Sequence, residues 1–436
     1  MKRRHFIGGI GALASLGGCA ATTATSRRHV VVVGGGYGGA TAAKYIRLWS
    51  VGAIDVTLIE PHAMFISCPL SNLVLGGSKQ MTDITLGYAG LARHGVRIVR
   101  ERAAHIDFDK QAVLLAGGQA LRYDRLVLSP GVDFLWDQLP GMQRTSAQDT
   151  VLHAWKAGAQ TVALRAQLEA MIDGGVFAMT IPPAPYRCPP GPYERACQVA
   201  HYFRRAKPKS KVLILDANED VVSKGALFKQ IWATRYAGMV EYRPGFHTVD
   251  VDAAARTAIS ELGDKVQAAV LNVIPPQRAG AIAAQGGLAN VNHRWCEVDF
   301  LTFASTRAAN VHVLGDAVFA APLMPKSAHM ANQHAKVCAG AVVDLLSGRA
   351  PNPAPMLTNT CYSFVSDREA IHVASVHAWD AAKKTLLVVP GSGGVSGAGP
   401  ANALEAAYAI SWARNIWSDT LSQAAEPSVY RSRGVR

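Results

Sequence analysis

The chain has 436 residues, which is long enough for two or three domains that each bury a hydrophobic core. Apolar residues make up 49% and charged residues 17%, a globular composition that excludes a disordered chain. The formal net charge is +13, but no run of five or more Lys and Arg and no zinc-finger, helix-turn-helix or RNA-binding pattern accompanies it. We therefore expect no nucleic-acid partner.

The first 26 residues have the pattern of an export signal. Arg3 and Arg4 form a twin-arginine pair, and an apolar stretch rich in glycine and alanine follows over residues 7–18. Residues 16–19 are also similar to a lipoprotein cleavage box, which would make Cys19 a lipidated N-terminus; plain peptidase cleavage before residue 27 is the open alternative. Both alternatives predict that the mature protein is in the periplasm, where disulfides persist. No apolar run reaches the roughly 18 residues of a membrane helix.

A glycine-rich turn follows the first predicted strand, residues 30–33. Gly34, Gly36 and Gly39 have the spacing G-x-G-x-x-G, and a helix is predicted from Ala40. Gly34 would permit the sharp turn, Gly36 would let the backbone approach a pyrophosphate, and Gly39 would let the helix pack close on the strand. The stretch predicts a dinucleotide-binding turn.

The next predicted strand, residues 56–59, strengthens that prediction. It ends in Glu60, about 20 residues beyond the glycines, where an acid would hold a ribose hydroxyl. Residues 61–70 form a loop that leads back toward the same cofactor. Residues 123–131 are a strand followed by Pro-Gly, similar to the strand that closes the first nucleotide section of two-dinucleotide flavoproteins. Residues 27–140 therefore form one part of a nucleotide-binding domain.

The second predicted domain, residues 141–276, departs from the pattern of a nicotinamide-binding domain. A helix at about residues 157–173 leads to a strand at 175–181, after which a second glycine fingerprint is expected. A proline-rich segment, residues 182–192, stands there instead. Because proline has a fixed φ and no N–H to offer a phosphate, we expect no second dinucleotide and no direct reduction by a nicotinamide cofactor.

Residues 277–350 return to the flavin domain. A predicted strand ends in Gly315 and Asp316, and in flavoproteins an Asp at such a strand end accepts a hydrogen bond from the ribityl chain, which makes FAD the expected cofactor. Lys326 precedes a helix whose N-terminus would point at the flavin pyrimidine, where negative charge develops on reduction. Residues 351–436 open with a proline-rich linker and contain a helix at about 401–417.

These segments predict an α/β protein with a discontinuous FAD-binding domain. Its fold class would be two Rossmann-like three-layer nucleotide-binding domains, similar to glutathione reductase, plus a small α+β C-terminal interface domain. The predicted divisions are 1–26 for the signal, 27–140 with 277–350 for the FAD-binding domain, 141–276 for the second domain, and 351–436 for the interface domain.

The seven cysteines show neither a C-x-x-C pair nor a haem-attachment or metal-site spacing, so we expect no haem and no metal on this chain. Cys296 and Cys338 lie in segments predicted to be packed, where a small buried side chain is expected. Cys188 and Cys361 lie in stretches rich in proline or polar residues. From the residues alone, a structural disulfide between domains and a catalytic pair stay equally open.

Several long and unusual strings make the chain resemble one family, the flavoprotein subunit of flavocytochrome c sulfide dehydrogenase. The resemblance extends over about residues 28–422, and its most specific strings are residues 38–46, 70–72, 187–196, 274–280 and 359–363. It implies that Cys68, which precedes the Leu-Ser-Asn string, is linked covalently to the 8α-methyl group of FAD. It also implies that Cys188 and Cys361 form a redox-active disulfide.

The resemblance further implies a reaction. Hydrosulfide would attack one sulfur of that disulfide, giving a persulfide on one cysteine and a thiolate that passes electrons to FAD. Glu194 would accept a proton, with a solvated or helix-capping carboxylate as the alternative. Since the chain has no haem site, the haem would sit on a separate cytochrome c subunit or on a soluble cytochrome c, and the positive net charge suits such docking.

Two other functions compete with this one. A sulfide:quinone oxidoreductase is a related flavoenzyme, and the helix at 401–417, with Trp412 and Trp417, would then lie on a membrane; a core or subunit-contact helix is the better interpretation. A non-catalytic flavin-binding partner of a sulfur-oxidation complex is disfavoured because Cys188 and Cys361 are both present.

Overall fold

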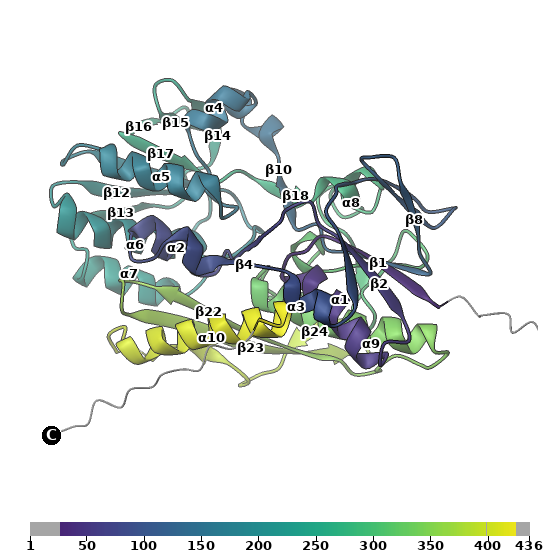
Figure 1. Ribbon diagram of the computed structural model, residues 1–436. Coiled ribbons are helices and arrows are strands. Elements are labelled where there is room, and N and C mark those ends of the chain that lie inside the picture. Colours follow the sequence, from purple (N-terminus) through teal and green to yellow (C-terminus); the bar gives the residue numbers. More distant parts are fainter. Residues whose placement is uncertain (1–26, 398, 424–436) are drawn as a thin grey trace, which may run out of the picture.

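The computed structural model of the protein describes residues 27–397 and 399–423 (Figure 1). The predicted twin-arginine signal and Cys19 lie outside these residues. Across the described part of the chain, no helix is both long and apolar enough to cross a membrane.

The first domain is built on a seven-stranded sheet in which β1 (His29–Val33) lies between β2 (Asp55–Ile59) and β9 (Arg125–Leu128), all parallel. Residues 30–33 are buried because helices and a second sheet cover the two faces, as expected for a parallel sheet. The remaining strands are β5 (Val96–Val99) at one edge and β21 (Val311–Val313), β20 (Ala304–Ser305) and β19 (Val298–Asp299) at the other. The sheet therefore joins residues 29–128 to residues 298–313, which makes this domain discontinuous in the sequence.

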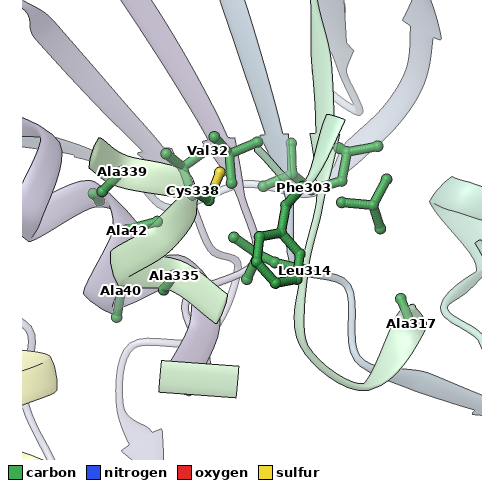
Figure 2. Packing of buried hydrophobic residues seen from close by; sticks show 14 of the residues in the cluster. Val32, Ala40, Ala42, Phe303, Leu314, Ala317, Ala335, Cys338 and Ala339 are labelled. Atoms are coloured by element: carbon green, nitrogen blue, oxygen red, sulfur yellow. The ribbon is translucent and has the colours of Figure 1, made fainter. Parts of the chain in front are cut away.

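Two helices, α1 (Tyr37–Trp49) and α9 (Ala328–Leu346), pack side by side on this sheet. Small side chains let them approach it closely. Figure 2 shows Ala40 and Ala42 of α1 with Ala335, Cys338 and Ala339 of α9 around Val32. Cys338 and Cys296 are fully buried in this core, which confirms the sequence prediction for both.

Helix α1 begins three residues earlier than predicted. Its N-cap is Gly36, and the Ala40 N–H donates to the Gly36 carbonyl at 3.0 Å, so the helix includes Gly38 and Gly39. The shorter elements of this domain are a set of helices and antiparallel strands around the sheet. They are β3 (Phe65–Ile66), α2 (Ser71–Gly76), β4 (Thr85–Leu86), α3 (Ala89–Arg93), β6 (Ala103–Asp107), β7 (Ala112–Leu115), β8 (Ala120–Arg122), β10 (Val132–Phe134), β18 (Gln277–Ala279) and α8 (Ala281–Gln285).

The second domain has a four-stranded parallel sheet in the order β13-β12-β11-β17. An aromatic core that includes Tyr193, Phe203 and Phe228 packs beneath it. Its helices and strands are α4 (Thr145–Thr150), α5 (Ala159–Ala170), β11 (Val176–Ile181), α6 (Gly191–Ala206), β12 (Lys211–Asp216), α7 (Gly225–Thr234), β13 (Val240–Arg243) and β17 (Val270–Val273), with the small antiparallel sheet β14 (Thr248–Asp252), β15 (Thr257–Ser260) and β16 (Lys265–Gln267). The helix predicted at 157–173 is α5.

The C-terminal part is an antiparallel sheet crossed by one long helix, the yellow α10 of Figure 1. The sheet consists of β22 (Met356–Phe364), β23 (Ala370–Asp380), β24 (Thr385–Val388) and β25 (Gly394–Val395). Helix α10 (Ala403–Leu421) starts where the Asn402 side chain accepts from the Glu405 N–H at 2.9 Å. It buries Ala409, Ala413 and Trp417 against the rest of the protein, so it is a packed helix. The predicted mixed α/β fold is confirmed.

Candidate active site

A cavity of about 870 Å³ lies where the three parts of the chain meet. Its size lies within the range of cofactor sites, which is about 300–1,000 Å³. Residues of the first domain, the second domain and the C-terminal part all line it. The lining residues include Gly36, Glu60, Cys68, Asn72, Arg187, Cys188, Glu194, Arg195, Asp316, Ser327, His329, Cys361, Tyr362 and Trp412.

The three fingerprint glycines have separate roles. Gly34 has φ +97°, and a Cβ there would lie 2.3 Å from the Ser129 carbonyl oxygen. A Cβ at Gly39 would lie 1.8 Å from the Gly34 carbonyl oxygen, whereas one at Gly36 would meet no protein atom within 4 Å. The fold therefore requires glycine at 34 and 39, and the space beside Gly36 belongs to the cavity.

Glu60 stands at the cavity wall with its carboxylate already oriented. Its Oε2 accepts the Gly35 N–H at 2.7 Å, and its Oε1 accepts the His62 N–H at 2.8 Å. The carboxylate is thus fixed at the end of β2, beside the glycine turn, where a ribose hydroxyl can reach it.

Asp316 follows β21 and presents an unused acceptor. Its Oδ1 is buried and accepts no hydrogen bond from residues 27–397 or 399–423, although the residue lines the cavity. Burial raises the pKa of this carboxyl, and Arg187 and Lys326 oppose that rise. A ribityl hydroxyl of FAD would satisfy the oxygen, since buried polar groups are normally paired. The free acceptor, the open space at Gly36 and the oriented Glu60 together fit FAD.

The Lys326 side chain contacts backbone carbonyls and an aromatic ring. Its Nζ donates to the carbonyl oxygens of Asp316, at 2.9 Å, and Val318, and lies 3.7 Å from the centre of the Trp295 ring. Burial lowers its pKa to about 7. The ammonium therefore supports the Asp316 turn from behind, and the cavity wall is formed by Ser327 and the first residues of α9. The predicted helix N-terminus is at the cavity, but the Lys326 side chain is turned to backbone carbonyls.

Cys188 and Cys361 face the same cavity, which also contains Cys68. Cys188 lies within the proline-rich segment and has φ +58°, and its N–H donates to the Lys326 carbonyl at 2.8 Å. Cys361 lies on β22. Burial raises the pKa of both thiols, and negative charge on Cys361 raises that of Cys188 further. The structure holds them as free thiols, and the disulfide remains a prediction.

Glu194 lies in the first turn of α6 and lines the same cavity as the two cysteines. Its Oε1 accepts the Phe364 N–H at 2.7 Å, and its Oε2 accepts from the Asn72 side-chain amide at 2.8 Å. Burial raises its pKa. The carboxyl therefore neither lies in bulk solvent nor caps its own helix, which were the two alternatives for this residue.

Two arginines of the same segment were not singled out from the sequence. Arg187 lies within hydrogen-bond reach of Cys68, and although its burial opposes charge, Cys68 and Asp316 raise its pKa. Arg195 is buried and donates to the Asn272 side chain at 2.8 Å and to the Ala154 carbonyl at 2.7 Å. Both arginines belong to the string 187–196, on which the resemblance partly rests. Their position in that string was the sequence feature that could have identified them.

The proline-rich segment does not form a phosphate cradle at the end of β11. It crosses to the first domain, where the Cys188 N–H meets Lys326. Asp216, which ends β12, is fully buried and accepts from Tyr193 Oη at 2.7 Å and Tyr242 Oη at 3.1 Å. The polar groups at this sheet edge are therefore engaged with protein. Among the described residues, no group of three or more His, Cys, Asp or Glu is arranged to hold a metal ion.

The fold and the site place the chain among the pyridine nucleotide-disulphide oxidoreductases, whose family model matches residues 28–179. More specific models match the rest: the central part of the sulfide dehydrogenase (flavocytochrome c) flavoprotein chain at residues 161–275, and the flavin-binding part of flavocytochrome c sulphide dehydrogenase at residues 353–421. The flavoprotein chain of Chlorobaculum thiosulfatiphilum is 55% identical over 38 residues, which are 9% of this chain and 77% of that sequence. The chain belongs to the flavocytochrome c sulfide dehydrogenase flavoprotein family.

More distant similarities agree with this class. The mitochondrial sulfide:quinone oxidoreductase of Mus musculus is 24% identical over 298 residues, which cover 64% of this chain and 63% of that relative, just under two-thirds of its length. Among solved structures, the sulfide:quinone oxidoreductase of Aquifex aeolicus superimposes with a TM-score of 0.74 at 17% identity, covering 91% of this chain and 93% of that one. At this identity the likeness establishes the fold.

Proposed function

We propose that the chain oxidises hydrogen sulfide to sulfane sulfur or polysulfide through a Cys188–Cys361 disulfide and FAD, and that it passes the electrons to cytochrome c. One observation carries this proposal. The two cysteines come from different domains and face one cavity whose other wall, at Gly36, Glu60 and Asp316, fits FAD.

When bound, FAD supplies a two-electron acceptor. The protein's own groups supply the sulfur chemistry: hydrosulfide attacks one sulfur, the disulfide bond breaks, and the products are a persulfide and a thiolate. Transfer of the sulfane sulfur to a further sulfide leaves both cysteines as thiolates, and their disulfide would re-form as the electron pair passes to FAD. Glu194 is the carboxyl placed to take up the proton, because it lies beside both cysteines and its buried environment raises its pKa.

Replacing Glu194 with glutamine should slow reduction of the flavin by sulfide about 100-fold, the lower range for loss of a general base. The carboxylate is the active form, so the wild-type rate should fall as the pH drops through its raised pKa. The rate of Glu194→Gln should not show this decrease at low pH. Anaerobic stopped-flow absorbance measures both, with the exposed Glu241→Gln as the control. An unchanged rate and profile would remove Glu194 from the reaction.

A covalent link between Cys68 and FAD belongs to the same proposal. Cys68 lines the same cavity as the cysteine pair, and its charge acts on Arg187. The denatured wild-type chain should be heavier than its polypeptide by one FAD, and Cys68→Ser should lose that mass while still binding flavin without the link. A denatured wild-type chain without added mass would rule the thioether out.

The electron acceptor separates the two candidate enzymes. We expect sulfide-reduced protein to reduce cytochrome c faster than a short-chain quinone when both are assayed side by side. The net charge of +13 suits an acidic partner surface, so the rate with cytochrome c should fall with added salt. The haem would be on a separate cytochrome c subunit or a soluble cytochrome. Faster quinone reduction would instead favour a sulfide:quinone oxidoreductase, whose fold the chain shares.

The proposed cellular location is the periplasm, reached through the twin-arginine signal, with lipidation at Cys19 as one form of the mature N-terminus. Replacing Arg3 and Arg4 with lysine should retain the protein in the cytoplasm. Cell fractionation with mass analysis of the N-terminal peptide measures both the export and the processing, and export of the double lysine variant would contradict the proposal.

A further inference from the structure

A buried lysine of the second domain is hydrogen-bonded to the strand that carries Cys361. Lys224 immediately precedes α7, and only 7% of its surface is exposed. Its backbone is left-handed, with φ +57° and ψ +34°, a conformation that non-glycine residues rarely adopt. Such a position persists only where the surrounding structure holds it.

Two hydrogen bonds hold the Lys224 ammonium on β22. Its Nζ donates to the Cys361 carbonyl at 3.0 Å and to Ser363 Oγ at 2.7 Å. An ammonium has three N–H donors, and these two bonds are the ones found for it within the described residues. No carboxylate forms an ion pair with it in that part of the chain. A buried cation in this situation stabilises whatever negative charge develops beside it.

The groups that face this ammonium are the Cys361 and Cys188 thiols and the Glu194 and Glu405 carboxyls. Burial lowers the pKa of Lys224, and negative charge on Cys361, the strongest of the four, raises it. The same coupling acts in return on Cys361: burial raises its pKa, Lys224 lowers it and Glu194 raises it.

Cys188 has a less favourable environment for charge. Burial raises its pKa well above the usual value, and Cys361, Glu194 and Cys68 raise it further. Of the charged groups that act on Cys188, only Arg187 lowers its pKa. The pair is therefore asymmetric, with negative charge favoured at Cys361.

We propose that Lys224 is a positioning residue that sets the direction of the sulfur chemistry, by stabilising Cys361 as the sulfur that leaves with the electron pair. This inference rests on the proposed sulfide oxidation. Hydrosulfide forms a bond to Cys188 Sγ, the Cys188–Cys361 bond breaks, and its electron pair goes to Cys361, which becomes the thiolate. Cys188 then carries the persulfide, and the proton on its terminal sulfur is the one that passes to Glu194.

The first test uses the wild-type holoprotein. A single turnover with one equivalent of sulfide is stopped with iodoacetamide, and peptide mass spectrometry locates the added sulfur. We expect it on Cys188 in at least about ten-fold excess over Cys361. Sulfane sulfur mainly on Cys361 would overturn the inference, whereas a flavin that sulfide does not reduce at all would overturn the proposed function instead.

The second test does not need turnover. In the reduced holoprotein, alkylation by iodoacetamide across a pH series reports the pKa of each thiol. Lys224→Met should move the Cys361 profile upward by about one pH unit or more, and Lys224→Arg should keep it near wild type. Lys229→Met, at an exposed lysine of the same helix, should change nothing.

Flavin content and thermal unfolding show whether Lys224→Met is folded. Should that variant fail to fold, Ser363→Ala removes one bond to the ammonium and should shift the Cys361 profile in the same direction by a smaller amount. A folded Lys224→Met or Ser363→Ala whose Cys361 profile matches wild type would overturn the role of Lys224.

Discussion

Replacing Cys361 with serine should abolish the reduction of the flavin by sulfide, with a loss in rate of at least about 1,000-fold. A serine hydroxyl cannot form the disulfide that hydrosulfide attacks, and it cannot leave as a thiolate. Cys361 lines the cavity and does not belong to the buried hydrophobic core. The variant should therefore fold and keep its flavin. Anaerobic mixing with sulfide, followed by flavin absorbance, measures the loss.

Two controls separate this result from a general defect. Dithionite should still reduce the flavin of Cys361→Ser, and Cys338→Ala, which changes a buried core cysteine of α9, should still respond to sulfide. If sulfide bleaches the flavin of Cys361→Ser at the wild-type rate, the disulfide route is wrong. Cys188→Ser should behave as Cys361→Ser does, since either loss removes the disulfide.

Replacing Gly36 with alanine should give a folded protein that lacks most of its FAD. The new methyl group meets no protein atom within 4 Å, so it projects into the space where the backbone would approach the pyrophosphate. We expect FAD occupancy at limiting cofactor to fall about ten-fold or more, which corresponds to about 1.4 kcal/mol. The ratio of flavin to protein absorbance measures occupancy, and circular dichroism measures the fold.

The contrast with Gly39 makes this result specific. A Cβ at Gly39 would overlap the Gly34 carbonyl, so Gly39→Ala should lower the free energy of unfolding by about 3 kcal/mol, the upper range for overpacking. Gly394→Ala, at an exposed glycine with open space around it, should leave both flavin content and stability unchanged. Full FAD occupancy in Gly36→Ala would show that the pyrophosphate does not lie against this turn.

Much of the fold followed from local patterns. The run of valines at β1, the glycine turn and the strand end at Gly315 and Asp316 each lie within about ten residues, so backbone sterics and strand burial dictate them directly. The observed element boundaries differ from the predicted ones, as at α1, because a single backbone hydrogen bond from Ala40 to Gly36 decides where the helix begins.

The direction of the Lys326 side chain could not be predicted from the sequence, for a definite physical reason. Its position before α9 correctly located the helix N-terminus, but the direction of a long flexible side chain depends on which acceptors surround it. Two backbone carbonyls and the face of Trp295 hold the ammonium, and Trp295 is distant in the sequence. Lys224 was missed for the same reason, since its partners on β22 lie in another part of the chain.

By itself the sequence determined the dinucleotide turn, the residue types of the flavin site and, through the resemblance, the two cysteines. These are contiguous motifs, and the residues that carry their chemistry are neighbours in the sequence. Only the tertiary structure decided that Glu194 lines the same cavity as Cys188 and Cys361, that Asp316 Oδ1 accepts no hydrogen bond from the described residues, and that Lys224 is hydrogen-bonded to the Cys361 carbonyl. Burial and charge at a site depend on segments brought together from distant parts of the chain, and the long-range packing of three domains sets them.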